Sequence, residues 1–394
     1  MSDPIAIETF DSIADIDPSV WNEVAPGHPM ASHGWLLTLE QTCRAKLRPV
    51  YLLSSSNGRP CAATLCTFPD RTNTIYTPDH LFFGRFRPWL QALGMSLQPV
   101  TICNPLGAHG AHIGTAASLT ARETAPHKEA LVQALETIAR ERGSGLIFTA
   151  LTDEERDVRA LLDERRYRTG RDFATCALDI RWQSFDDYTA ELGRKHPRMP
   201  RTIRNERNRV RKSGVRIERI EDARPHDAAL HELGAHHMEA RAGRPFPFEA
   251  SFFPRLLENM QDSAHLFGAF QGTELAGFSL MVERNGVAVV YLMGLDPGRG
   301  RNDLLYFVLG YDEPIEEAIR RGFQTMQFGG THYELKARRG CFTIPSDFRY
   351  RAPSPLRGAL ASAWIEVHTR WMDRKNRTAH RFQSPDRFQK PAAT

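Results

Sequence analysis

The stretch LDPGRGRNDLLYF, residues 295–307, places two arginines in a glycine-rich turn that leads into an apolar, helix-like segment. The N-terminus of a helix carries partial positive charge and unpaired backbone N–H groups, and glycine lets a ligand approach the backbone closely. The turn therefore predicts a binding site for phosphate. The alternative is an ordinary turn in which Asn302 caps the helix. The predicted phosphate-binding residues are Gly298, Arg299, Gly300, Arg301 and Asn302.

A second group of polar residues follows the strand-like run FQTMQFGG, residues 323–330. A glycine pair at the end of a parallel strand opens the crevice in which α/β proteins collect their sites. Glu334 is the candidate for a base that accepts the proton of an attacking amine or orients it, and His332 competes for that role. Two alternatives are structural: a capping box of Thr331 with Glu334, or a set of surface ion pairs. The candidates for binding a carboxylate or phosphate of the substrate are Lys336 and Arg339.

Two tyrosines and one glutamate complete the candidate set. Either Tyr306 or Tyr311 could protonate a leaving thiolate or ribose oxygen, and Tyr311 could instead contact substrate, although tyrosines on an apolar helix more often pack in the core. The two lie five residues apart, so a regular helix would project them in different directions. Glu239 is expected on the surface or at an acceptor pocket, where it would bind substrate. Its neighbours His236 and His237 would point about 100° apart on a helix, so this group predicts no metal site.

The segment from Arg194 to Lys212 carries nine Lys or Arg and one acid, Glu206. Such an excess of one sign cannot be neutralised by ion pairs within the segment, and it attracts phosphates. The alternative is a solvated helix face. A long basic surface suits RNA, which presents many phosphates. The predicted RNA-binding residues are Arg201, Arg204, Arg207, Arg211 and Lys212.

The composition is that of a globular protein, with 41% hydrophobic and 25% charged residues among 394. That length predicts two domains. The six cysteines form no CxxC pair, so we expect reduced thiols and no structural metal. The acidic N-terminus lacks the pattern of a signal peptide, and no apolar run is long enough to span a membrane. We therefore expect a cytoplasmic protein without membrane insertion.

The order of elements suggests one α/β unit repeated twice. Apolar runs flank the turn dipeptides Asn57-Gly58 and Asn285-Gly286, which predicts two hairpins. After each hairpin come an amphipathic helix, a glycine and an apolar strand. The predicted domains are residues 1–182, residues 183–352 with the main site, and a helical and disordered tail at 353–394.

Antiparallel strands, a glycine–arginine turn, a helix and a parallel strand occur in the order typical of the GNAT N-acyltransferases, which this chain resembles. The GNAT turn pattern, Q/R-x-x-G-x-G/A, is loosely met by GRGRND. Four segments over roughly residues 8–350 also resemble predicted N-acyltransferases of the peptidoglycan biosynthesis or recognition type, which are related to Fem-type aminoacyltransferases. The segments are WNEVAPGHPMASHGWLLTLEQT, ASFFPRLLENM, LLYFVLGYDEPIEEAIRRG and GGTHYELKARRGCFTIP. The resemblance implies two tandem GNAT-like units, each a mixed, partly antiparallel sheet flanked by helices.

The chain departs from this family at two polar positions. Where the family tends to have His-Phe-Glu and Glu-His-Lys, this chain has apolar residues at Val308 and Leu335. A role in specialised metabolism is therefore as compatible with the sequence as a cell-wall role.

The resemblance implies amide-bond formation between an activated acyl donor and the amine of a small molecule or peptide. The donor is aminoacyl-tRNA, which the basic segment favours, or acyl-CoA, which the glycine–arginine turn favours. Either would be a co-substrate, and no permanently bound cofactor is expected. Two alternatives remain: a non-catalytic tRNA- or nucleic-acid-binding protein on a degenerate GNAT scaffold, and a non-catalytic partner in a cell-wall complex.

Overall fold

The computed structural model describes residues 4–69, 89, 96–103, 107–242, 245–296 and 302–381. The chain divides into two compact units. Unit 1 comprises Met1–Phe173 and Pro345–Arg374, and unit 2 comprises Ala174–Ile344 and Lys375–Thr394. This division differs from the predicted domain boundary at residue 182 and from a separate tail after residue 352. The first boundary lies earlier because the strand at residues 175–179 pairs in the sheet of unit 2. There is no separate tail because strand β15 and most of the last helix belong to unit 1.

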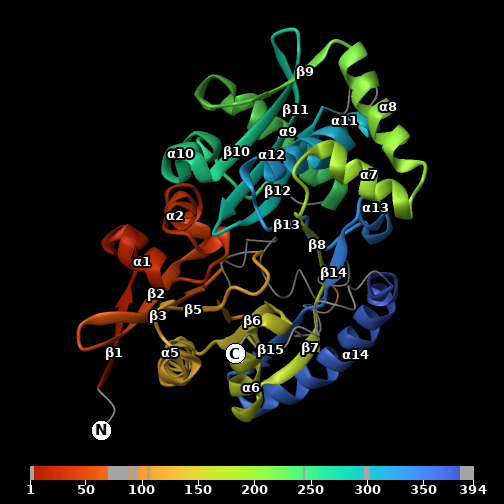
Figure 1. Cartoon of the computed structure of the whole chain (residues 1–394). Coiled ribbons are helices and arrows are strands. Elements are labelled where there is room, and N and C mark those ends of the chain that lie inside the picture. The colour runs from red at the N-terminus through yellow and green to blue at the C-terminus, as the bar shows by residue number, and fades with distance from the viewer. Residues whose placement is uncertain are drawn as a thin grey trace. The chain divides into compact units, whose positions relative to one another are not determined.

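Unit 1 is built on a mixed sheet with the strand order β1-β2-β3-β4-β6-β15-β7, in which β5 also pairs with β3. Neighbouring strands are antiparallel except β4 and β6, which run parallel and are joined through helix α5. Figure 1 labels most of these strands, with β15 beside β6 and β7. The strands are β1 (Ile5–Phe10), β2 (Pro49–Ser56), β3 (Arg59–Thr67), β4 (Val100–Cys103), β5 (Ile113–Thr115), β6 (Gly145–Leu151), β7 (Arg168–Arg171) and β15 (Asp347–Arg351).

Helices cover both faces of the sheet in unit 1. Leu146 and Phe148 of β6 pack in the core cluster that contains residues of α5 and α6. Ile147, between them in sequence, packs in a different cluster with α14. This alternation is what a strand buried on both faces requires. The helices of unit 1 are α1 (Pro18–Val24), α2 (His33–Leu47), α5 (Ala121–Glu141), α6 (Arg156–Glu164) and α14 (Pro355–His380), of which α14 runs past the end of the unit at Arg374.

Unit 2 contains a second mixed sheet with the order β14-β8-β13-β12-β11-β10-β9. Only β12 and β13 run parallel, and helices α11 and α12 connect them. The strands are β8 (Thr175–Asp179), β9 (Val215–Arg219), β10 (Ala264–Gln271), β11 (Glu274–Arg284), β12 (Val287–Leu295), β13 (Thr325–Gln327) and β14 (Phe342–Ile344).

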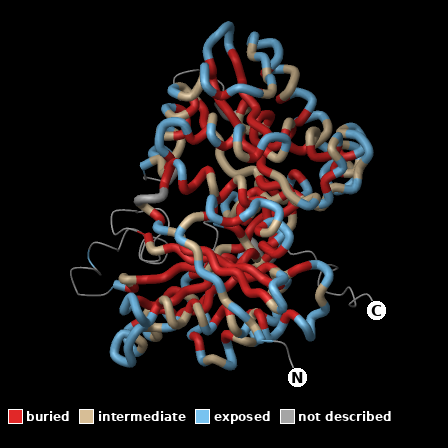
Figure 2. Tube along the Cα trace, turned by 90° about the vertical axis from the view of Figure 1, so that its left-hand side faces the viewer, coloured by how far each residue is buried: buried red, intermediate tan, exposed pale blue. Residues whose placement is uncertain are grey.

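The sheet of unit 2 is also covered on both faces. Met281 and Ala288 pack in the core cluster that contains residues of α7, α8, α11 and α12. On the other face, Phe253 of α10 lies edge-on to Phe278 of β11 at 5.0 Å. Figure 2 shows the buried residues in red along the strands. The helices are α7 (Phe185–Lys195), α8 (Met199–Lys212), α9 (Asp227–Ala242), α10 (Phe252–Met260), α11 (Asn302–Phe307), α12 (Glu313–Arg321) and α13 (Tyr333–Arg338).

The predicted hairpins are present at the predicted dipeptides. Asn57 and Gly58 have φ of +52° and +72°, and Asn285 and Gly286 have φ of +52° and +77°. Positive φ at both central residues is the geometry that Asn-Gly favours in tight hairpins. These turns join β2 to β3 and β11 to β12.

Both units contain the predicted order of antiparallel strands, helix and parallel strand, which confirms two tandem GNAT-like units with mixed sheets flanked by helices. Each sheet also contains a strand that directly follows, in the chain, a strand of the other sheet. Strand β8 follows β7 in the chain but pairs with β13 and β14. Strand β15 follows β14 but pairs with β6 and β7. Among the described residues, no helix is both long enough and apolar enough to cross a membrane.

Candidate functional site

The glycine–arginine turn connects the predicted elements. Strand β12 ends at Leu295 and helix α11 begins at Asn302. Residues 297–301 lie outside the described part of the chain. The phosphate ligands Gly298, Arg299, Gly300 and Arg301 therefore stay predictions, and the structure gives Asn302 only its place as the first residue of α11.

Helix α11 passes into a π-helical turn, Val308–Asp312, before α12 begins. π-helical turns are rare in proteins, and those that occur often lie at functional sites. This one brings the hydroxyl oxygens of Tyr306 and Tyr311 to 3.4 Å, although a regular helix would point them apart. Tyr311 is buried, stacks on Phe328 with ring centroids 5.3 Å apart, and has its pKa raised by burial. Tyr311 therefore packs in the core, and half-buried Tyr306 is the tyrosine of this pair nearer to solvent.

Arg339, predicted to bind substrate, is buried between two carboxylates of unit 2. Its guanidinium donates to Asp312 of the π-helical turn and, at 2.6 Å, to Glu206 of α8. The rings of Phe307 and Tyr311 flank the guanidinium at 4.7 and 5.4 Å. Burial raises the pKa of Asp312 to about 7, although Arg339 favours its ionised form. Arg339 thus joins three segments in the interior, and its charge does not face a substrate.

Lys336 is also held in the interior. Its Nζ donates to the carbonyl oxygens of Phe328, at 2.5 Å, and Gly329, at 3.0 Å. Burial lowers its pKa. The side chain therefore holds the segment that follows β13. Its ammonium group is occupied by backbone carbonyl oxygens and not by a carboxylate or phosphate of a substrate.

Glu334 and His332, the two candidates for the base, are exposed. His332 has φ of +55° and is the N-cap of α13, with no side-chain capping bond. The capping box of Thr331 with Glu334 is therefore wrong. Glu334 instead accepts from Arg338 at 3.0 Å, with its side chain 68% exposed. An amine arriving from solvent can reach this carboxylate, so the role of base stays a prediction.

A pocket of about 650 Å³ lies in unit 2 between α7, α8 and strand β9. Residues 215–218 of β9, whose side chains alternate between faces, all line it, so the pocket runs along the edge of this strand. Strand β9 is the last strand in the order of its sheet, with only β10 beside it. The wall from α8 includes Arg204, Arg207, Asn208 and Arg211, which recur at the spacing of one helix face.

The predicted RNA-binding residues therefore fall into two groups. Arg204, Arg207 and Arg211 line the pocket, whereas Arg201 and Lys212 are exposed on α8 outside its lining. The pocket arginines are not equivalent. Arg207 binds the acids of α12, with Glu316 at 2.5 Å and Glu313 at 3.2 Å. It also lies 4.7 Å from the ring centre of Phe185. Its charge is thereby largely balanced by protein groups. Arg216 of β9 also lines the pocket and binds Glu218 at 2.7 Å, which leaves Arg204 and Arg211 as the main cations of the pocket.

Glu239 lies on α9, where the predicted helix is confirmed, and its side chain is exposed. It is not among the residues that line the pocket. Glu239 therefore does not join Arg204, Arg207 and Arg211 in this pocket, and its role at an acceptor site stays a prediction.

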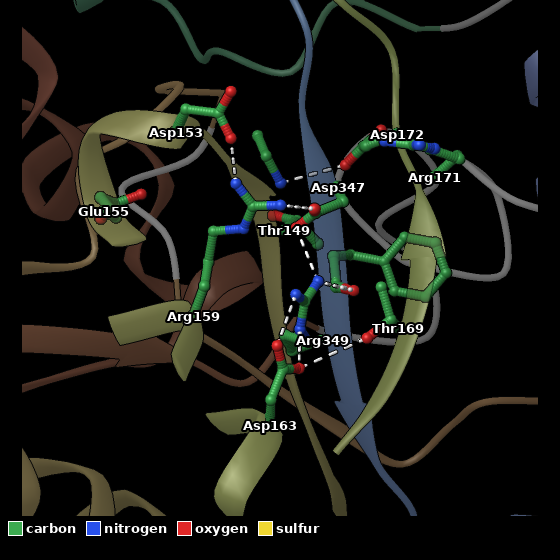
Figure 3. Close-up of polar contacts among 12 residues, drawn as sticks. Thr149, Asp153, Glu155, Arg159, Asp163, Thr169, Arg171, Asp172, Asp347 and Arg349 are labelled. Atoms are coloured by element: carbon green, nitrogen blue, oxygen red, sulfur yellow. Dashed lines mark hydrogen bonds and ion pairs between the residues drawn. The ribbon is translucent and has the colours of Figure 1, made fainter. Parts of the chain in front are cut away.

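Unit 1 contains an ion-pair network that the sequence did not reveal (Figure 3). Asp347 of β15 accepts from Arg159 of α6 at 2.6 Å and from Arg349 at 2.7 Å. Arg349 also binds Asp163 of α6 through two nitrogens, at 2.6 and 3.1 Å. Burial raises the pKa of Asp347 despite these arginines. The network fastens β15 to α6 and is structural.

Near this network, His112 is bound through both ring nitrogens. Nδ1 lies 2.9 Å from Glu155 and Nε2 lies 2.7 Å from the carbonyl oxygen of Thr149. Burial opposes ionisation of Glu155, but the charge and hydrogen bonds of His112 hold the pKa of this carboxyl below its usual range. A histidine held on both sides anchors its loop to β6 and is not available to a substrate.

Solved structures of other proteins have a similar architecture. Similar folds occur in FemX (TM-score 0.55, 12% identity, 89% of this chain and 99% of that chain) and in a conserved protein of unknown function from Bacteroides thetaiotaomicron VPI-5482 (0.53, 13%, 88% and 99%). L-PGS from Bacillus licheniformis is a third example (0.51, 12%, 84% and 95%). At these identities the likeness concerns the fold alone.

Curated protein sequences give no match. A family model, FemAB_like, described as peptidoglycan biosynthesis/recognition, matches residues 12–385. That match spans both units and includes the π-helical turn, the arginine-lined pocket and the segment after β13. The chain belongs to the FemAB-like family of peptidoglycan biosynthesis and recognition proteins.

Proposed function

We propose that this protein is an N-acyltransferase that transfers an aminoacyl group from tRNA to the amine of a small molecule or peptide. The observation that carries the proposal is the pair of exposed arginines, Arg204 and Arg211, that line a pocket of about 650 Å³. Arg201 and Lys212 extend the same positive surface along α8. A tRNA presents many phosphates to such a surface. Membership of the FemAB-like family supports a peptidoglycan precursor peptide as the acceptor.

The proposed reaction is balanced without a further reagent. The amine nitrogen attacks the ester carbonyl carbon, a C–N bond forms, and the C–O bond to the ribose breaks. The amine loses one proton and the ribose oxygen gains one. Glu334, or His332 in its place, accepts the first proton, and Tyr306 supplies the second. General acid–base catalysis contributes about 10²–10⁴-fold, and the positioning of donor and amine contributes much of the rest.

A second donor, acyl-CoA, is favoured by the turn between β12 and α11. Two glycines and two arginines there precede a helix N-terminus, which suits a pyrophosphate. The leaving group would then be a thiolate. The double variant Arg299→Ala with Arg301→Ala should raise KM for acyl-CoA while the protein stays folded. Unchanged KM in this variant would return the turn to a purely structural role.

A non-catalytic RNA-binding protein is the alternative from another class. It is favoured by the ion pair between Glu334 and Arg338 and by the apolar Val308 and Leu335, which pack in the core cluster of unit 2. Such a protein would bind tRNA without turnover.

The deciding experiment supplies the purified protein with charged total tRNA or a panel of acyl-CoA thioesters, together with peptidoglycan precursor peptides and small amines. Mass spectrometry then detects any amide product. Amide formed from charged tRNA supports the proposal, and amide formed only from a thioester favours the second donor. Binding of tRNA without product supports the non-catalytic alternative. If the protein neither binds tRNA nor forms an amide, both the proposal and this alternative are refuted. Charged tRNA and CoA esters are cytoplasmic, so the proposed reaction belongs in the cytoplasm.

A further inference from the structure

Helix α14 presents an apolar face to solvent. Leu356, Leu360, Val367 and Trp371 are 74%, 51%, 56% and 43% exposed. At 100° per residue, all four project within an arc of about 60° on one side of the helix. Scattered exposed hydrophobic residues are normal, but a contiguous stripe on one helix indicates a surface that has a partner.

This stripe is not the side of α14 that packs in unit 1. Ala361 and Ile365 are buried in the core cluster with Phe348 and Tyr350 of β15. Met372, about two helical turns after Ile365, is fully buried on the same side. These positions lie on the opposite side of the helix from the exposed stripe. A helix at a protein surface normally buries one apolar side and turns polar residues outward, so α14 is unusual in having two apolar sides.

The charge around the stripe has one predominant sign. Helix α14 carries five Lys or Arg and two acids. Both acids are bound to arginines, Glu366 to Arg370 at 2.5 Å and Asp373 to Arg171 at 3.5 Å. Arg374 and Arg377 project to the same side as the stripe, at its C-terminal end. The outward side therefore combines an apolar segment, a tryptophan and a cationic end, which is the pattern of helices that lie in the plane of a membrane surface.

We propose that α14 docks unit 1 on the surface of an anionic lipid bilayer, with Leu356, Leu360, Val367 and Trp371 among the acyl chains and Arg374 and Arg377 among the phosphates. The helix lies along the surface and does not span it. The proposal is independent of the acyl donor and of the RNA-binding role of α8.

A second copy of the chain fits this face less well. In a two-fold symmetric contact with the helices antiparallel, the arginines of one copy would lie on the leucines of the other. With the helices parallel, the arginines would lie against each other, and like charges would be brought out of water together. A bilayer surface instead offers apolar chains and phosphates at the depths where this helix presents its two kinds of side chain.

The test is flotation of the full chain with vesicles of phosphatidylcholine alone and vesicles that also contain phosphatidylglycerol. We expect binding to the anionic vesicles, weakened by salt. The variant Leu360→Ser with Val367→Ser should bind at least about 10-fold more weakly, because interfacial binding scales with buried apolar area. Arg374→Ser with Arg377→Ser should lose the preference for anionic vesicles. The matched control is Trp89→Ser, which removes an exposed apolar side chain outside α14 and should bind like the wild type.

Several outcomes would overturn the proposal. These are no flotation of the wild type, equal flotation of the Leu360→Ser/Val367→Ser variant, or an equal loss in the Trp89→Ser control. Circular dichroism and thermal unfolding establish whether each variant is folded. We expect all of them to fold, because the substituted side chains are exposed. Light scattering after size-exclusion chromatography measures the molar mass in solution and so tests whether a second copy of the chain occupies this face instead. A dimer that only the α14 variants dissociate, without vesicle binding, would identify the face as a contact between copies.

Discussion

Arg339 and Asp312 form an ion pair inside unit 2 that ties the end of α13 to the π-helical turn. Glu206 of α8 binds the same guanidinium from a third segment. Val308 opens that turn and lines the arginine-rich pocket. The buried ion pair therefore holds together the segments that shape one wall of the proposed donor site.

Removing Arg339 should destabilise the protein strongly. Arg339→Ala leaves two buried carboxylates without their partner, and breaking a buried pair in this way costs about 3–5 kcal/mol. The neighbouring Arg338→Ala is a matched control, because its partner Glu334 is exposed and such surface pairs are worth about 1 kcal/mol or less. Urea unfolding measures both variants. Equal midpoints would show that the buried pair contributes no more than the exposed one.

Asp312 should make the stability of unit 2 depend on pH. Burial raises its folded pKa to about 7, whereas an unfolded aspartate titrates near about 4. Between these values the native state binds more protons than the unfolded state, so this residue makes stability fall as pH rises from about 4 to about 7, and the loss levels off above that range. Asp312→Asn stays neutral and should lack this part of the slope. Unfolding titrations of both proteins across this range test the prediction, and identical slopes would contradict it.

The pocket arginines should contribute to the salt dependence of tRNA binding. Each phosphate contact contributes about 1 to the log–log slope of affinity against salt concentration. Arg204→Ala with Arg211→Ala should therefore lower that slope by about 2. Arg209→Ala is the control on the same helix, since Arg209 is exposed and does not line the pocket. Filter binding at several salt concentrations measures the slopes. An equal effect per residue in the control would mean that RNA contacts α8 without preference for the pocket side.

Glu334→Gln separates catalysis from surface pairing. If Glu334 is the base, kcat should fall by about 10²-fold or more with stability unchanged. Arg338→Ala removes the ion-pair partner but keeps the carboxylate, so it should retain most of the activity. Amide formation under single-turnover conditions gives the rates. A Gln variant with near-native kcat would assign Glu334 to the surface pair alone.

Local sequence chemistry predicted much of the fold. The hairpins at Asn57-Gly58 and Asn285-Gly286 need only positive φ at adjacent residues, so the dipeptides locate them. Amphipathic spacing likewise located the helix between the hairpin and the parallel strand in each unit. The place of β15 was not predictable in this way, because pairing with β6 and β7 joins segments far apart in the chain.

The site was less predictable because charge alone does not reveal burial. Lys336, Arg338 and Arg339 occur together in a polar segment, yet Lys336 and Arg339 are buried and Arg338 is exposed. The partner Glu206 lies 133 positions from Arg339. In unit 1, Arg159 and Asp347 are 188 positions apart. Such contacts depend on the tertiary fold, and no local pattern specifies them.

The position of β15 has a consequence for the order in which the protein matures. A ribosome releases β6 and β7 long before β15, the strand that lies between them in the finished sheet. Until β15 is made, β6 lacks its neighbour on that side, and β7 lacks the strand that joins it to the sheet. Unit 1 therefore completes its sheet only after nearly all of unit 2 has been synthesised, even though its own first residues are made at the start.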